Sequence, residues 1–298
     1  MTAAPERLAP AKVNLFLHVG ALAADGYHPL SSLMAFADVG DVVRMEPAAS
    51  LSFSITGPFG AALSAEADNL VTRARDMALD AFPGDREPFR LVLDKQLPIA
   101  AGIGGGSADA AAALRLLDDV LRLDRGGGAG ERFDAIARAL GSDVPACLGG
   151  LPTFATGRGD DLAEPPRFCD LDIVLANPGV LSPTGAVYRA YDDLGAPGGA
   201  EPPAWSAAMT TPGAVVAFLK ATRNDLEAPA IGLTPAIGDC LDILRAQTES
   251  LFVRMSGSGA TCFAIAEDAE AAAALARRLA ATHPHWWVRA ARLTGSLA

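Results

Sequence analysis

The sequence predicts an α+β fold, in which pairs of strands are connected through single helices. Three observations support it: stretches with period two at 11–20 and 89–95, a glycine-rich loop running into an alanine-rich helix at 97–117, and a strand–strand–helix–strand order near the end. A steady alternation of strand and helix would instead predict a doubly wound parallel sheet.

In the first half of the chain, residues 11–20 alternate apolar and polar side chains imperfectly, which predicts a strand. A second and a third extended piece are expected within 31–47. Helical spacing of apolar residues predicts a helix over 68–81, and 89–95 is the next strand. Further helices are predicted at 131–140, 235–248 and 268–281, and further strands at 171–176, 251–255, 261–266 and 286–293.

The composition is that of a globular protein, since 50% of the 298 residues are hydrophobic and 20% are charged. The net charge of −11 disfavours nucleic acid and anionic membranes as partners. No signal peptide and no apolar run long enough to span a bilayer is recognised. Four cysteines without CxxC spacing are expected to be reduced thiols of a cytoplasmic protein, rather than disulfides or zinc ligands: Cys147, Cys169, Cys240 and Cys262.

The most unusual stretch is the glycine-rich loop at 98–108, with four glycines within five residues. Glycines let backbone N–H groups converge on an anion, and the positive end of the following helix points to the same place. The sequence therefore favours phosphate binding over a plain flexible loop. No lysine follows a glycine, which excludes a Walker A motif, and Ser107 occupies the place of the last glycine of GxGxxG.

Three further motifs are ambiguous when each is taken alone. Asp143, between a Gly-Ser turn and a proline, reads locally as a helix N-cap. Residues 255–261 (MSGSGAT) are either a hairpin turn or a second backbone surface near a phosphate. Lys12 is one of three lysines in the chain and lies in a short apolar strand, where a lysine can simply protect an edge.

Taken together and in this order, the motifs resemble those of the GHMP kinase family, which includes galactokinase, homoserine kinase and the mevalonate kinases. Eight segments occur between residues 9 and 261 in the order expected of family members that act on a cytidine diphosphate-linked methylerythritol. They are APAKVNLFLHV, DGYHPL, GIGGGSADAAAAL, GSDVP, GRGD, NPG, SPT and MSGSGAT. The resemblance implies an ATP-binding N-terminal domain at 1–165, like the second domain of ribosomal protein S5, and a ferredoxin-like C-terminal domain at 166–298.

The resemblance also implies roles for individual residues. Lys12 and Asp143 match the catalytic pair, and Asn14, Tyr27 and His28 match positions that hold the cytidine diphosphate group. Thr184 and Tyr188 fall where the family has a threonine and an aromatic residue beside the base. ATP is expected to bind along Pro98, Ile99, Ala100, Ala101, Gly102, Ile103, Gly104, Gly105, Gly106, Ser107 and Ala108.

The implied chemistry is transfer of the γ-phosphate of ATP to a tertiary hydroxyl of the substrate, where the protein supplies placement and charge stabilisation. Asp143 would accept or orient the hydroxyl proton, and Lys12 would keep Asp143 ionised. Mg²⁺ would bridge the phosphates, with Ser107 as a candidate ligand. The early Asp109 is expected to favour the dipole of its helix.

Three other functions compete with this one. Another GHMP kinase, with a mevalonate, homoserine or sugar acceptor, would not need the aromatic residues Tyr27 and Tyr188. A non-catalytic ATP-binding sensor on the same fold would need neither Lys12 nor Asp143. A nicotinamide-dependent oxidoreductase is disfavoured by the failed GxGxxG pattern. The oligomeric state is left open.

Overall fold

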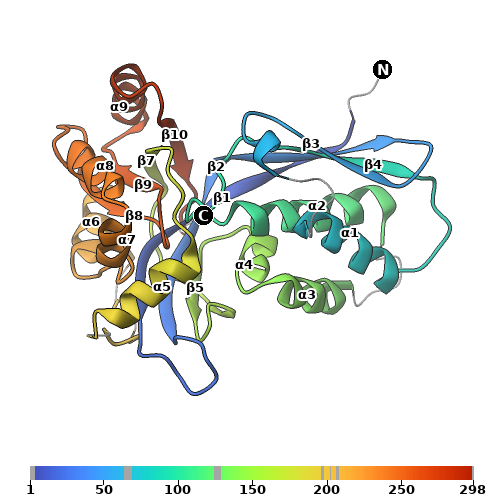
Figure 1. Cartoon of the computed structure of the whole chain (residues 1–298), viewed down its shortest axis with the longest axis horizontal. Coiled ribbons are helices and arrows are strands. Elements are labelled where there is room, and N and C mark those ends of the chain that lie inside the picture. Colours follow the sequence, from blue (N-terminus) through green and yellow to red (C-terminus); the bar gives the residue numbers. More distant parts are fainter. Residues whose placement is uncertain are drawn as a thin grey trace. The chain divides into compact units, whose positions relative to one another are not determined.

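The computed structural model describes residues 4–63, 69–123, 129–195, 198–201, 203–205 and 208–296 (Figure 1). By its internal contacts the chain divides into two compact units. Unit 1 is made of 1–11, 40–97 and 104–150, and unit 2 of 12–39, 98–103 and 151–298. Each unit has its own strands and its own helices.

In unit 1, strand β4 (Phe89–Asp94) lies between β3 (Ser52–Thr56) and the later part of β2 (Leu30–Pro47). β3 runs parallel to β4, whereas β4 runs antiparallel to β2. β1 (Glu6–Val19) pairs with β2. The helices are η1 (Gly60–Ala62), α1 (Leu70–Ala81), α2 (Gly105–Leu121), α3 (Ala129–Leu140) and α4 (Val144–Gly149).

Helices α1 to α4 lie on one face of the β3–β4–β2 sheet (Figure 1). Leu91 and Leu93 of β4 are buried on one face of the strand, whereas on the other face Arg90 is exposed and Val92 is buried. The alanine-rich α2 has high helix propensity, and its small side chains allow close packing against α1. α1 begins where the side chain of Asn69 accepts the N–H of Val71 at 2.8 Å.

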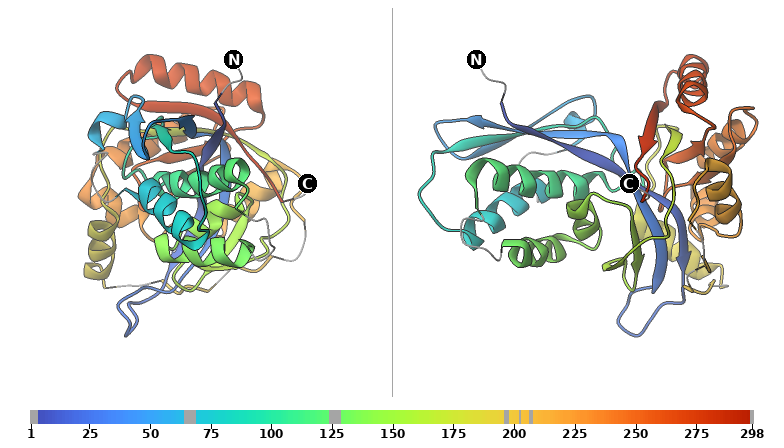
Figure 2. Two further views of the ribbon diagram at one scale, coloured as in Figure 1. Left: turned by 90° about the vertical axis from the view of Figure 1, so that its right-hand side faces the viewer. Right: turned by 180° about the vertical axis from the view of Figure 1, so that it is seen from behind.

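In unit 2, four antiparallel strands follow the order β10 (Trp287–Leu293), β7 (Leu171–Asn177), β9 (Cys262–Ile265) and β8 (Phe252–Met255). β5 (Thr153–Thr156) pairs with β6 (Asp161–Ala163) and with β2. The helices are α5 (Thr184–Asp193), α6 (Pro212–Lys220), α7 (Glu227–Leu233), α8 (Ala236–Arg245) and α9 (Ala269–Thr282). Helices α8 and α9 lie on one side of this sheet (Figures 1 and 2). Their buried side chains, among them Leu241 and Leu275, share one core with Val174 and Ala264 of the sheet.

The predicted α+β class is confirmed. Residues 31–47, predicted as two extended pieces, belong to a single strand, because β4 pairs with its later part and β5 with its earlier part. The helix predicted over 68–81 is α1, and Asp68 lies outside the described residues. The elements that were not predicted are β3, β5, β6, η1, α4, α5, α6 and α7.

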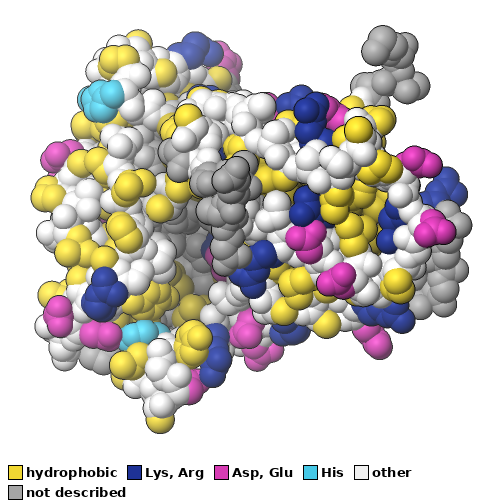
Figure 3. All heavy atoms as spheres, turned by 45° about the vertical axis from the view of Figure 1, so that its right-hand side comes forward, with side chains coloured by type: hydrophobic (Ala, Val, Ile, Leu, Met, Phe, Trp, Pro, Cys, Tyr) yellow, Lys and Arg dark blue, Asp and Glu magenta, His cyan; other side chains and the backbone are white. Residues whose placement is uncertain are grey.

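Charged side chains are dispersed over the face of the molecule shown in Figure 3, where described Lys and Arg side chains alternate with Asp and Glu rather than form one basic patch. Among the described residues, none of the helices is long and apolar enough to cross a membrane.

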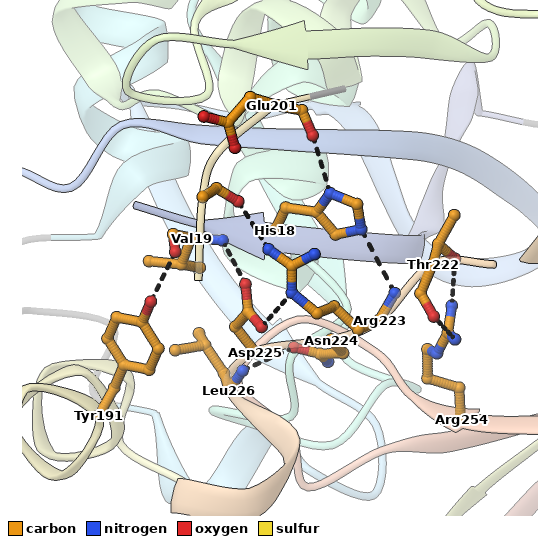
Figure 4. Close-up of polar contacts among 11 residues, drawn as sticks. His18, Val19, Tyr191, Glu201, Thr222, Arg223, Asn224, Asp225, Leu226 and Arg254 are labelled. Atoms are coloured by element: carbon orange, nitrogen blue, oxygen red, sulfur yellow. Dashed lines mark hydrogen bonds and ion pairs between the residues drawn. The ribbon is translucent and has the colours of Figure 1, made fainter. Parts of the chain in front are cut away.

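The end of β1 is held by the segment that precedes α7. Leu17 pairs with Asn224 in a parallel bridge, and the N–H of Val19 donates to the carboxylate of Asp225 at 2.7 Å (Figure 4). Between them, the buried His18 accepts the N–H of Arg223 on Nε2 at 3.3 Å. Nδ1 therefore carries the proton and donates to the carbonyl of Glu201 at 3.0 Å, which fixes a neutral imidazole.

This neutral histidine should make the protein less stable in acid. Burial, opposed by the bond to Glu201, lowers the pKa of His18 below 6.5. Below pH 6.5, His18 therefore binds a proton in the unfolded chain but stays neutral in the folded chain. As the pH is lowered, the free energy of unfolding decreases by up to about 1.4 kcal/mol per pH unit. Urea unfolding from pH 7 to pH 5 should show a shallower fall for His18→Gln than for the wild type. The exposed His285 is the control, since His285→Gln should keep the wild-type slope, and an unchanged slope in His18→Gln would contradict the assignment.

Candidate active site

The second half of the glycine-rich loop forms the N-terminus of α2 in unit 1. Gly104 is the N-cap, with a left-handed φ of 63° that suits glycine. The N–H groups of Gly105, Gly106 and Ser107 belong to the first turn, which has no acceptors within the helix. The N–H of Ala108 makes the first helical bond, to the carbonyl of Gly104 at 2.9 Å. This helix start therefore presents the donors that a phosphate needs.

The first half of the loop, Pro98–Ile103, lies in unit 2 against the turn that connects β8 with β9. The Oγ of Ser256 donates to the carbonyl of Gly102 at 2.9 Å, and the N–H of Thr261 donates to the carbonyl of Ala101 at 3.0 Å. The sequence leaves open whether this turn is a plain hairpin or a surface beside the phosphate loop. It connects two antiparallel strands and also contacts the glycine-rich loop.

Gly102 has no room for a side chain. A Cβ at Gly102, where φ is 73°, would lie 2.3 Å from the carbonyl oxygen of Ser256 and 2.7 Å from the nitrogen of Gly259. Because both are backbone atoms, Gly102→Ala should displace the loop, raising KM for ATP about tenfold and costing about 2 kcal/mol of stability. Kinetics and urea unfolding test this. Gly213→Ala, where nothing lies within 4 Å, is the control, and equal KM values in the two variants would contradict the prediction.

β1 places Lys12 and Asn14 next to these motifs in unit 2. The N–H of Lys12 donates to the carbonyl of Ile103 at 2.9 Å, and that of Asn14 donates to Ser256 Oγ at 3.1 Å. The Nδ2 of Asn14 donates to Ser32 Oγ at 2.7 Å. Within the described part of the chain, its Oδ1 is buried without a hydrogen-bond partner. Such an acceptor is costly unless something donates to it, so Asn14 is suited to contact a bound molecule.

His28 and Tyr188, two of the predicted base-binding residues, lie together. The ring of His28 is buried, and its centroid is 5.2 Å from that of Tyr188 with the planes tilted by 32°. Nδ1 of His28 donates to the carbonyl of Gly20 at 2.9 Å, and Nε2 lies 3.3 Å from the carboxylate of Asp192. The sequence also allowed an ordinary surface pair of Tyr27 and His28, but His28 is not at the surface.

Tyr27 and Thr184 have other partners in unit 2. Tyr27 is 54% exposed, and the guanidinium of Arg158 lies 4.1 Å from the centroid of its ring. Arg158 is itself bonded to Asp25 at 2.7 Å. The Oγ1 of Thr184 lies 2.9 Å from the Oγ of Ser258, which places Thr184 at the turn between β8 and β9.

Asp143 directly precedes α4 in unit 1 and is half-buried. It occupies the N-cap position that the local sequence predicts, but its side chain makes no capping hydrogen bond to the described helix α4. Lys12 belongs to unit 2. The catalytic pairing of Lys12 with Asp143 therefore stays a prediction from the resemblance.

The role expected for Asp109 is wrong. Its side chain does not serve the helix dipole, because it is buried and its Oδ2 lies 2.7 Å from the Nζ of Lys95, a residue absent from the predicted site. Burial, opposed by Lys95, raises the pKa of Asp109 to about 8. Burial alone would lower the pKa of Lys95, but Asp109 and Asp41 outweigh it and raise that pKa. A lysine directly after an apolar strand, in a chain with three lysines, was the available signal.

Both glycine motifs, at 98–108 and at 255–261, lie within stretches of the chain that match family models. The model of the GHMP kinase N-terminal domain matches residues 69–150, and that of the C-terminal domain matches residues 212–285. The chain belongs to the GHMP kinase family.

Its relatives include 4-diphosphocytidyl-2-C-methyl-D-erythritol kinase of Caulobacter vibrioides, which is 52% identical over 287 residues, or 96% of this chain and 98% of the relative. A kinase of the same name from Xanthobacter autotrophicus is 48% identical over 94% of this chain and 96% of its own. A crystal structure of 4-(cytidine 5'-diphospho)-2C-methyl-D-erythritol kinase has a TM-score of 0.74 and 34% identity, covering 97% of this chain and 99% of that one. The crystal structure of homoserine kinase from Cytophaga hutchinsonii shares the fold, with a TM-score of 0.67 and 17% identity. The match covers 100% of this chain and 96% of that one.

Proposed function

We propose that this chain transfers the γ-phosphate of ATP to the 2-hydroxyl of 4-diphosphocytidyl-2-C-methyl-D-erythritol, in the methylerythritol phosphate route to isoprenoid precursors. The observation that carries the proposal is the 52% identity, over 96% of the chain, to a kinase of that substrate. The reaction takes place in the cytoplasm, in keeping with the four free cysteines.

The described residues fit a nucleotide triphosphate. Gly105 and Gly106 have no side chains at the start of α2, so phosphate oxygens can approach the N–H groups of the first turn. The α2 helix also directs its positive end to this point, which compensates for the net charge of −11. The residues from Pro98 to Ile103, in the first half of the loop, are assigned to ATP on the resemblance alone.

Asp143 and Lys12 act on the acceptor. Asp143 accepts the proton of the 2-hydroxyl or orients that hydroxyl, and Lys12 keeps the carboxylate ionised and offsets charge on the transferring phosphoryl group. Asn14, Tyr27, His28, Thr184 and Tyr188 hold the cytidine diphosphate part. The neighbouring rings of His28 and Tyr188, and the acceptor of Asn14 that has no partner among the described residues, support this assignment.

Among the described residues, no group of three His, Cys, Asp or Glu side chains could hold a metal ion. When bound with the nucleotide, Mg²⁺ neutralises charge on the phosphates. The hydroxyl of Ser107, in the first turn of α2, is the side chain that we assign to it.

The test is ATP consumption by the purified protein with Mg²⁺ and 4-diphosphocytidyl-2-C-methyl-D-erythritol, beside mevalonate, homoserine and galactose. Turnover with the cytidyl substrate alone is the expected result. Turnover with another acceptor in its place would keep the family and refute the cytidyl substrate. ATP binding without turnover of any acceptor would favour the sensor.

A further inference from the structure

A buried ionic bridge lies beneath the start of α2 in unit 1. The Nζ of Lys95 is 2.5 Å from Oδ2 of Asp41 and 2.7 Å from Oδ2 of Asp109. The exposed fractions of Lys95, Asp41 and Asp109 are 3%, 0% and 3%. Asp41 comes from β2, Lys95 follows the last residue of β4, and Asp109 belongs to α2, so a single ammonium group joins three elements.

The bridge fixes the entry to the glycine-rich loop. The second oxygen of Asp41, Oδ1, accepts the N–H of Gln96 at 2.6 Å and that of Leu97 at 2.8 Å. These two residues lead directly into Pro98, the first residue of the loop. Because Asp41 holds both backbone groups and the ammonium of Lys95, the direction in which the chain enters the loop depends on this carboxylate.

The same bridge fixes the exit from the loop. Asp109 lies in α2 just after the first turn, and Lys95 holds it directly. A Cβ placed on Gly105, the first residue of α2, would lie only 3.0 Å from the Nζ of Lys95. The ammonium therefore packs against the helix start whose N–H groups face the phosphates.

Stability alone does not account for this cluster. One cation faces two carboxyl groups, and in the described structure Oδ1 of Asp109 is buried without a hydrogen-bond partner. Buried ion pairs generally add little stability over apolar residues of similar volume. The bridge instead sets a defined distance between the loop entry and the start of α2. Apolar packing would fix this distance less precisely.

We propose that Lys95 is a positioning residue for ATP: by joining Asp41 to Asp109 it sets the spacing between the two ends of the glycine-rich loop, and so the positions of the N–H groups that bind the phosphates. This inference rests on the proposed function in taking ATP as the phosphate donor. Lys95 itself need not touch the nucleotide.

The test compares Lys95→Met with the wild type in binding of Mg-ATP by calorimetry without acceptor, and in steady-state kinetics. Misplaced N–H groups should raise Kd and KM for ATP about tenfold or more. The KM for the cytidyl acceptor should stay within about threefold, because the acceptor makes no use of these donors. A purely structural role would lower the melting temperature and the active fraction without changing Kd.

Arg90→Met is the matched control, because Arg90 of β4 pairs with Glu46 of β2 on the exposed side of the same two strands. It should leave Kd for ATP unchanged. If Lys95→Met does not fold, Asp41→Asn is tested in its place. The asparagine amide has the volume of the aspartate and keeps an acceptor for the N–H groups of Gln96 and Leu97, but it weakens the bond to Lys95. A folded Lys95→Met or Asp41→Asn protein with wild-type Kd overturns the proposal.

The two proposals fail separately. A wild-type protein that binds Mg-ATP but does not phosphorylate the cytidyl substrate refutes the proposed function and leaves the calorimetric test of Lys95 valid. A wild-type protein that does not bind Mg-ATP refutes the role of Lys95 together with the nucleotide site.

Discussion

Replacing Asp143 by alanine is expected to lower kcat at least about a hundredfold, because the variant can no longer take or orient the proton of the acceptor hydroxyl. KM and Kd for ATP should change little, since the proposed site binds the phosphates through backbone N–H groups of the loop and α2 and not through Asp143. Steady-state kinetics with the cytidyl acceptor and calorimetry with Mg-ATP measure the two effects separately.

Asp134→Ala is the control for this experiment, because Asp134 is an exposed carboxylate of α3 in the same unit. It should behave as the wild type. If Asp143→Ala turns over as fast as Asp134→Ala, Asp143 has no catalytic role, although the kinase assignment would stand. A fall in kcat together with loss of ATP binding would instead assign Asp143 to the nucleotide site.

The second large effect is expected at Arg254, a guanidinium buried in unit 2. Its Nη1 donates to the carbonyl of Leu15 at 3.0 Å, and its Nη2 donates to the carbonyl of Leu219 at 3.1 Å. Nη2 also donates to the carbonyl of Thr222 at 2.7 Å (Figure 4). Nη1 also donates to Oγ1 of Thr222 at 2.8 Å. Burial, opposed by Glu227, lowers the pKa of Arg254 to about 10, so the side chain is still charged at neutral pH.

Arg254→Met should therefore lower the free energy of unfolding by roughly 3–5 kcal/mol, because three buried carbonyls each lose a charged donor at once. Urea unfolding measures the loss. Arg245→Met is the control: Arg245 is 48% exposed, and its pairs with Glu227 and Asp242 should be worth less than about 1 kcal/mol. A loss below 1 kcal/mol at Arg254 would mean that water replaces the guanidinium.

Elements with strong local signals could be predicted from the sequence. The ends of β4 and α9 are predicted to within one residue, since β4 alternates and α9 is alanine-rich behind the N-cap Asp268. Helix α5 could not be predicted in this way. It carries Gly185 in its first turn and only Val187 and Tyr191 are buried, so tertiary packing rather than propensity stabilises it.

In the candidate site, too, the features with a local sequence signal could be predicted and those that depend on distant residues could not. The glycine loop could be recognised because its signal is contained in a few consecutive residues. The bridge of Lys95 could not, because its partner Asp41 lies 54 residues away and pairing across that distance leaves no local pattern. The place of Asn14 likewise involves a distant residue, because its N–H bonds to Ser256, 242 residues further along the chain.

The interleaving of the two units also bears on how the protein is made. Unit 1 has all of its residues once position 150 has left the ribosome, and it can fold while synthesis continues. Leu17 and Val19 are made early, yet they share a core with Cys262, Leu275 and Val288, which are made near the end. Although β2 is available early to pair with β1, the nascent chain therefore carries an apolar strand end whose core neighbours from β9, α9 and β10 are missing through most of translation. That strand is a candidate contact for ribosome-associated chaperones, and a chain stopped before β9 should aggregate rather than fold.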